Sequence, residues 1–183
     1  MNKILVPIDF SEHSEFALRV AATIAKRSKS ELVALHMLGL SDEGLTRRET
    51  EELQESILNL KFSDTKFTDF LDRIYLHGVK IQPYVQRNKD FFEIDRIAKN
   101  NGACLIVMGS HGSKGISEVF VGSNTEKVVR TSSLPVLVIK SPVVNFKFNK
   151  AVFICDFNEV YIKPFLNAWK FFKSFKSLFK ILY

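Results

Sequence analysis

The sequence alternates repeatedly between short apolar, β-branched runs and longer segments with helical spacing of apolar residues. Strands that alternate with helices in this way form βαβ units and a parallel sheet. The pattern predicts strands at residues 3–8, 31–37, 79–86, 104–108 and 135–140. It predicts helices at residues 12–29, 47–76, 90–100 and 123–131, the first with Ser11 as its N-cap. We therefore expect an α/β fold, an open parallel sheet with helices on both faces.

The chain restarts its own pattern near its C-terminus. Residues 149–159 align without gaps on residues 2–12, at an offset of 147 positions. An internal repeat of this kind decides the domain organisation. We expect one domain at residues 1–141, a linker at 142–148, and an incomplete second repeat, a β-α-β fragment, at 149–183.

The expected helix of this fragment carries a large apolar stripe, formed by Ile162, Phe165, Leu166, Trp169 and Phe172. A fragment without the remaining strands cannot cover such a stripe, and exposed apolar patches are typical of interaction sites. We therefore expect the fragment to pack against the first domain or against another chain.

Composition and charge exclude several classes of protein. No apolar run approaches the ~18–20 residues of a membrane span, and the N-terminus has no secretory signal, which predicts a cytoplasmic protein without membrane contact. The formal net charge is +6, of which +5 lies beyond Phe146. A nucleic-acid-binding domain needs a basic surface, so the nearly neutral first domain argues against nucleic acid. Cys104 and Cys155 lie in apolar runs and are expected to be small core residues.

A glycine-rich segment carries the strongest chemical signal. Met108-Gly109-Ser110-His111-Gly112 ends a strand, and Gly122-Ser123-Asn124-Thr125-Glu126 begins a helix nine residues later. Ligands bind at this edge of open α/β sheets. Glycines allow close backbone approach and positive φ angles, and a helix N-terminus favours phosphate. Ser123 and Glu126 also match a capping box, so the spacing alone leaves open a purely structural, well-capped connection.

This segment resembles the G-x-x-G-x9-G-S/T signature of the nucleotide-binding branch of the universal stress protein family. The match is carried by Gly109, Gly112, Gly122 and Ser123. The resemblance extends over residues 1–141, because residues 4–11 are similar to the family's first strand and its aspartate. Residues 35–37 and 134–140 resemble the ends of its second and last strands. It implies a five-stranded parallel sheet in the order 3-2-1-4-5.

The resemblance also implies a binding site for an adenine nucleotide, ATP with or without Mg²⁺. The residues that would line its adenine and ribose end are Pro7, Asp9, Met37, Met108 and Gly109. Those that would hold the phosphates through backbone amides and hydroxyls are Gly112, Gly122, Ser123, Asn124 and Thr125. Asn124 departs from the apolar residue often found at its position. His111 is interpreted as a loop residue, and Phe91 and Phe92 as packing residues.

Three functions remain open from the sequence. A nucleotide-binding stress-response or regulatory module is favoured, because the glycine segment is complete. A slow ATPase is the second, although no G-x-x-x-x-G-K-S/T loop is present. The third is a nucleotide-free dimerisation module, as in the family's other branch. A homodimer through the edge strand at residues 135–140 is expected. Asp156 matches Asp9 but is not expected to bind nucleotide, because the fragment lacks a glycine loop.

Overall fold

The computed structural model describes residues 3–37, 65–86, 90–110 and 122–183. The chain divides into two compact units, residues 1–143 and 144–183. Each unit is described by itself below as unit 1 and unit 2.

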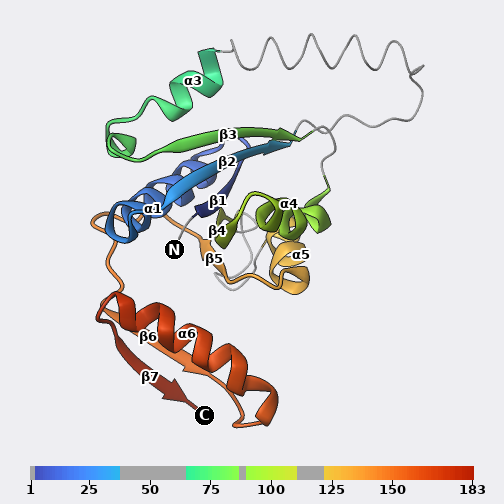
Figure 1. Cartoon of the computed structure of the whole chain (residues 1–183), viewed down its shortest axis with the longest axis vertical. Coiled ribbons are helices and arrows are strands. Elements are labelled where there is room, and N and C mark those ends of the chain that lie inside the picture. The colour runs from blue at the N-terminus through green and yellow to red at the C-terminus, as the bar shows by residue number, and fades with distance from the viewer. Residues whose placement is uncertain (1–2, 38–64, 87–89, 111–121) are drawn as a thin grey trace, which may run out of the picture. The chain divides into compact units, whose positions relative to one another are not determined.

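Unit 1 contains a five-stranded, all-parallel sheet in the order β3-β2-β1-β4-β5 (Figure 1). This confirms the expected α/β class and strand order. The strands are β1 (Lys3–Ile8), β2 (Glu31–Met37), β3 (Ile81–Gln86), β4 (Ala103–Gly109) and β5 (Val136–Ile139). Each strand predicted from the sequence therefore begins and ends within two residues of the observed strand.

The α-helices of unit 1 are α1 (Glu12–Ser28), α3 (Thr65–Leu71), α4 (Ile94–Asn100) and α5 (Ser123–Thr131). Short 3₁₀ turns occur at η1 (Ile74–Leu76) and η2 (Phe91–Glu93). The predicted helix at residues 47–76 is wrong at its C-terminal end, because α3 stops at Leu71 and Arg73 is extended (φ −119°, ψ 138°). Residues 47–64 of that prediction lie outside the described residues.

The two faces of the sheet have separate helical covers. Leu5, Val33 and Leu35 are fully buried in a cluster with residues of α4 and α5, among them Ile94 and Val128. Side chains alternate between faces along a strand, so the intervening residues face the other side, where α1 packs on β1 and β4. A parallel sheet is stable only when both faces are covered, and unit 1 meets this requirement.

The edges of the sheet are β3 and β5. Pro83 lies in β3, which fits an edge strand because proline cannot donate a ladder hydrogen bond. At the other edge, β5 is the strand expected to pair in a homodimer, and that pairing stays a prediction.

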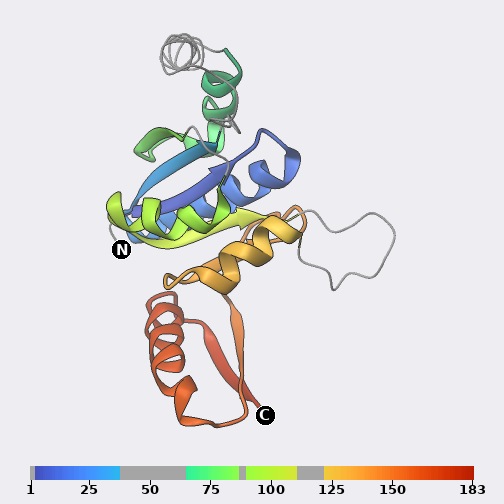
Figure 2. The ribbon, with the colours of Figure 1, turned by 90° about the vertical axis from the view of Figure 1, so that its right-hand side faces the viewer.

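Unit 2 is a β-α-β fragment with two parallel strands, β6 (Lys150–Ile154) and β7 (Leu178–Leu182), connected through η3 (Glu159–Tyr161) and α6 (Ile162–Ser174). Figure 2 shows α6 along one side of the two strands. Its backbone repeats features of unit 1 at the offset of 147: Phe10 and Phe157 have φ of 63° and 59°, and Lys29 and Lys176 have φ of 52° and 57°. These correspondences support a second copy, which stays a prediction.

The apolar stripe of α6 divides into two groups. Phe165 and Phe172 face the strands, with ring centroids 5.8 and 5.7 Å from that of Phe179. Ile162, Leu166 and Trp169 are 57%, 45% and 39% exposed. Only part of the apolar stripe is therefore covered within unit 2, because a single pair of strands contacts only part of the circumference of a helix.

The two cysteines differ from their expected burial. Cys104 lies in β4 but is only partly buried, and its thiol lies 3.4 Å from the carbonyl oxygen of Lys3. Cys155 follows the last residue of β6 and is also partly buried. Among the described helices, none is both long and apolar enough to cross a membrane.

Candidate functional site

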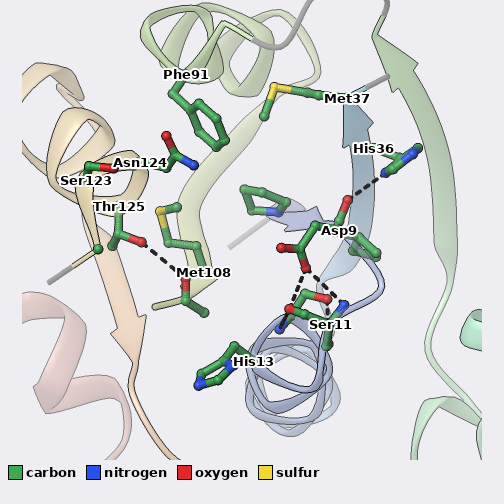
Figure 3. Close-up of a pocket in the computed structure, with 15 residues that line it drawn as sticks. Asp9, Ser11, His13, His36, Met37, Phe91, Met108, Ser123, Asn124 and Thr125 are labelled. Atoms are coloured by element: carbon green, nitrogen blue, oxygen red, sulfur yellow. Dashed lines mark hydrogen bonds between the residues drawn. The ribbon is translucent and has the colours of Figure 1, made fainter. Parts of the chain in front are cut away.

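A pocket of about 530 Å³ opens at the carboxyl ends of β1, β2 and β4, beside the N-terminus of α5 (Figure 3). Nine of the ten residues expected to form the site line this pocket: Pro7, Asp9, Met37, Met108, Gly109, Gly122, Ser123, Asn124 and Thr125. The tenth, Gly112, lies outside the described residues, as does His111. Three strands and one helix thus bring together residues that are up to 118 positions apart in the sequence. Their roles in binding stay predictions.

The turn from β1 into α1 fixes Asp9 at the pocket wall. Its Oδ1 accepts hydrogen bonds from the backbone N–H of Ser11 at 3.0 Å and from the Ser11 hydroxyl. Ser11 Oγ in turn accepts from the backbone N–H of Ser14 at 3.2 Å, which makes Ser11 the N-cap of α1 as predicted. Phe10, which lies between Asp9 and Ser11, adopts a left-handed conformation (φ 63°). The carboxylate is therefore oriented by the turn itself.

His36 ties the ends of β1 and β2 together beneath the pocket. Its Nδ1 lies 2.8 Å from the carbonyl oxygen of Ile8, and because a carbonyl only accepts, Nδ1 carries the donated proton. The imidazole is 9% exposed and packs on the Phe10 ring at 4.6 Å between centroids. Phe10 also contacts Phe70 of α3 edge-on, at 5.5 Å. The contacts of the Phe10 ring with His36 and Phe70 stabilise Phe10 in its left-handed conformation.

The N-terminus of α5 forms the opposite wall, and its capping differs from the expectation. The N-cap is Gly122, in an extended conformation (φ −56°, ψ 145°) with no side-chain cap. Ser123 is already the first helical residue, so the expected capping box with Glu126 is wrong. A helix start without a side-chain cap leaves backbone N–H groups for an anion. The N–H of Gly122 itself donates to Oγ of the buried Ser110 at 3.0 Å.

Two further features determine the structure at the carboxyl end of β4. The Thr125 hydroxyl donates to the carbonyl oxygen of Gly109 at 3.2 Å, which joins α5 to β4. A Cβ on Gly109 would lie 2.2 Å from the backbone oxygen of His13, far inside van der Waals contact. Gly109 is therefore required because the first turn of α1 approaches it closely, rather than by a positive φ angle.

Comparison with known proteins agrees with this arrangement. The model of the universal stress protein family matches residues 1–140. The chain belongs to the universal stress protein family.

Similar members come from archaea and bacteria. The universal stress protein MJ0577 of Methanocaldococcus jannaschii is 30% identical over 154 residues, covering 76% of this chain and 94% of the relative. YxiE of Bacillus subtilis is 29% identical, covering 76% of this chain and 99% of the relative. The solved structure of MJ0577 superposes with a TM-score of 0.57 over 78% of this chain and 98% of its own.

A longer relative also aligns with unit 2. A universal stress protein from Archaeoglobus fulgidus is 25% identical with a TM-score of 0.67. The alignment covers 98% of this chain but 66% of that chain. Nearly all of the present chain, unit 2 included, thus has a counterpart in a longer member of the family.

Sequence reasoning missed six residues that line the pocket: Ile8, Ser11, His13, Ser14, His36 and Phe91. Most of these residues could have been predicted from the position of Asp9. Residues at the end of a strand and at the start of the following helix lie at the same edge of the sheet as Asp9. Phe91 is different, because the sequence interpretation placed it with Phe92 as a packing residue. In the structure Phe91 lines the pocket, whereas Phe92 is 58% exposed.

The pocket combines three kinds of wall. Pro7, Met37, Phe91 and Met108 are apolar, Asp9 is a carboxylate with oriented oxygens, and the start of α5 presents backbone N–H groups and hydroxyls. Apolar surface suits a planar base, a carboxylate accepts hydrogen bonds from sugar hydroxyls, and a helix N-terminus suits phosphate. The arrangement matches the three chemical parts of a nucleotide.

Proposed function

We propose that this universal stress protein is a stress-response regulatory module that binds an adenine nucleotide, with ATP as its ligand. The observation that carries the proposal is a single pocket with the Asp9 carboxylate on one wall and the N-terminus of α5, without a side-chain cap, on the other. The base and ribose occupy the end formed by Pro7, Met37 and Met108. The phosphates lie against Ser123 and its neighbours in the first turn of α5.

The pocket fits such a ligand in size and in charge. Pockets for small molecules measure about 300–1,000 Å³, and this one has about 530 Å³. Asp9 is the one carboxylate among the described lining residues. Mg²⁺ is commonly held by phosphates with one or two carboxylates and several waters, so any Mg²⁺ here is carried by the triphosphate.

The direct test is calorimetric titration of nucleotide-free protein with ATP and Mg²⁺. Saturable binding with a dissociation constant below the millimolar range is expected. If no heat of binding is seen at millimolar ATP, the nucleotide proposal fails, and the nucleotide-free dimerisation module takes its place.

Asp9→Ala sharpens the test, because unit 2 provides a matched control. Asp156 Oδ1 accepts from the backbone N–H of Asn158 at 3.1 Å, as Asp9 Oδ1 does from that of Ser11 at 3.0 Å. Both substitutions remove this backbone hydrogen bond, and Asp9→Ala also removes the one from the Ser11 hydroxyl, but only Asp9 lines the pocket. Asp9→Ala is expected to weaken ATP and adenosine equally, by about tenfold or ~1.4 kcal/mol. Asp156→Ala is expected to leave both affinities unchanged, and equal losses in the two variants would contradict the proposed contact.

A further inference from the structure

Two adjacent phenylalanines in η2 have different surroundings. Phe91 is partly buried against the core cluster of unit 1 and lines the pocket. Phe92 is 58% exposed and has the Lys127 Nζ 5.8 Å from its ring centroid. The turn that separates them is held by Asp90, whose carboxylate accepts from the Phe92 backbone N–H at 2.9 Å. The local backbone therefore directs only Phe91 into the pocket.

Phe91 and Met37 form one end of the pocket. Figure 3 shows the Phe91 ring and the Met37 side chain on the side of the pocket away from His13, with the Asn124 side chain beside Phe91. Both residues pack against the same core cluster, which includes Ile94 and Met108. A ring supported from behind by a packed core loses little freedom when a ligand binds, and such preorganisation increases affinity.

The chemistry of this end is that of a base-binding surface. An aromatic side chain stacks on any base face and contributes about 1–3 kcal/mol per base. A methionine side chain is polarisable and packs well against aromatic rings. By contrast, the start of α5 offers hydrogen-bond donors suited to anions.

We propose that Phe91 is the aromatic wall of the base subsite and contributes to affinity by stacking on the base. The inference rests on the proposed nucleotide function and adds a role that is independent of the phosphates. A leucine at this position fills similar apolar volume but has no π face, so it separates stacking from simple packing.

The test compares Phe91→Leu with the neighbouring control Phe92→Leu in the full chain. Binding of ATP, adenosine and inorganic tripolyphosphate is measured by calorimetry, after circular dichroism has shown that each variant has the wild-type thermal midpoint within a few degrees. Phe91→Leu is expected to weaken ATP and adenosine by the same factor, about tenfold, which corresponds to ~1.4 kcal/mol. Its affinity for tripolyphosphate is expected to equal that of the wild type, and Phe92→Leu is expected to change none of the three.

Phe91→Tyr keeps the aromatic face and serves as the conservative variant. It is expected to retain adenosine affinity within about twofold (~0.4 kcal/mol). If Phe91→Leu is unstable, Phe91→Met is measured in its place against Phe91→Tyr, and the same loss of adenosine affinity is expected.

The possible failures are distinguishable. Wild-type adenosine affinity in Phe91→Leu, or an equal loss of tripolyphosphate affinity, overturns the stacking role while the nucleotide function stands. Failure of the wild type to bind ATP or adenosine overturns the nucleotide function, and the role of Phe91 with it.

Discussion

The β1-α1-β2 segment of unit 1 and the β6-α6-β7 segment of unit 2 follow nearly the same backbone path. In each, a left-handed phenylalanine, Phe10 or Phe157, precedes the helical segment, and a left-handed lysine follows it, Lys29 directly after α1 and Lys176 two residues after α6. The hydrogen bond that closes the helix is also shared. In unit 1 the Ser30 N–H donates to the carbonyl oxygen of Ala25, and in unit 2 the equivalent N–H, 147 residues later, donates to that of Phe172.

The two segments differ in what covers the second face of their strands. Leu5, Val33 and Leu35 are 0% exposed beneath α4 and α5. At the same positions in unit 2, Val152 is 57% exposed, Lys180 is exposed, and Leu182 is 55% exposed. A β-α-β segment supplies one helical layer, and a parallel sheet needs two. Local sequence therefore specifies the path of the segment, whereas a buried core forms only where a second helical layer covers the strands.

The aromatic content of unit 2 partly offsets this deficit. Phe148 is 8% exposed and packs against Phe171, Phe172 and Phe175, with ring centroids 4.7–5.4 Å apart. Among residues 144–183, all of which the structure describes, it is the only buried one. Unit 2 therefore has a small aromatic cluster where unit 1 has a two-sided core.

The largest effect is expected from paired truncations at equivalent positions. Leu5→Ala removes a fully buried side chain, and such changes cost about 2–5 kcal/mol of unfolding free energy. Val152→Ala removes a side chain that is 57% exposed, and the expected cost is below about 1 kcal/mol. Urea unfolding followed by far-ultraviolet circular dichroism measures the free-energy change in Leu5→Ala. Urea unfolding followed by the fluorescence of Trp169, the single tryptophan of the chain, measures that in Val152→Ala.

These variants also test whether the uncovered face of unit 2 has a partner in solution. A loss of several kcal/mol in Val152→Ala would mean that another surface covers this face. The expected packing of the fragment against the first domain or another chain would then explain the loss.

An intermediate effect is expected from Asp95, which connects α4 to the turn between α5 and β5. Its Oδ1 accepts from the Ser132 hydroxyl at 2.8 Å and from the backbone N–H groups of Ser133 and Leu134, and its Oδ2 lies 2.7 Å from the Lys99 Nζ. Burial raises the pKa of this carboxyl, but the hydrogen bonds from these groups outweigh it and lower the pKa from 3.8 to about 2. Asp95 thus stabilises the second layer that unit 2 lacks.

The sign of the pH dependence follows from the lowered pKa. The stabilisation by Asp95 is fully present above the unfolded-state pKa of 3.8 and is lost as the pH falls toward 2. Asp95→Asn is expected to lower the unfolding free energy of unit 1 by about 2 kcal/mol at neutral pH. The difference from the wild type should shrink between pH 4 and pH 2. Urea unfolding at several pH values measures this, and a difference independent of pH would contradict it.

The sequence predicted the fold further than it predicted the site. The alternation of apolar runs located all five strands of unit 1, most clearly the inner strands β1, β2 and β4, which are covered on both faces and apolar over nearly their whole length. The end of α3 was misplaced, because the apolar spacing continues past Arg73 although the backbone there is extended. At the site, spacing and resemblance located Asp9 and the start of α5, but not Phe91. Which of two adjacent phenylalanines enters a pocket depends on the direction of a 3₁₀ turn, which no local pattern encodes.

The smallest effect tests whether the two segments share their backbone strain. Lys29, directly after α1, and Lys176, two residues after α6, are left-handed (φ 52° and 57°). This conformation costs a residue with a Cβ about 1–2 kcal/mol. Glycine removes this cost but loses about 0.5–1 kcal/mol of chain entropy on folding. Lys29→Gly and Lys176→Gly are therefore each expected to stabilise their own unit by about 0.5 kcal/mol. Trp169 fluorescence recorded during urea unfolding reports the gain in unit 2, and far-ultraviolet circular dichroism, to which unit 1 contributes most of the helix and strand, reports the gain in unit 1. Equal gains in unfolding free energy support a true structural repeat. A gain in only one unit would show that the two left-handed lysines differ in strain although the backbone paths are similar.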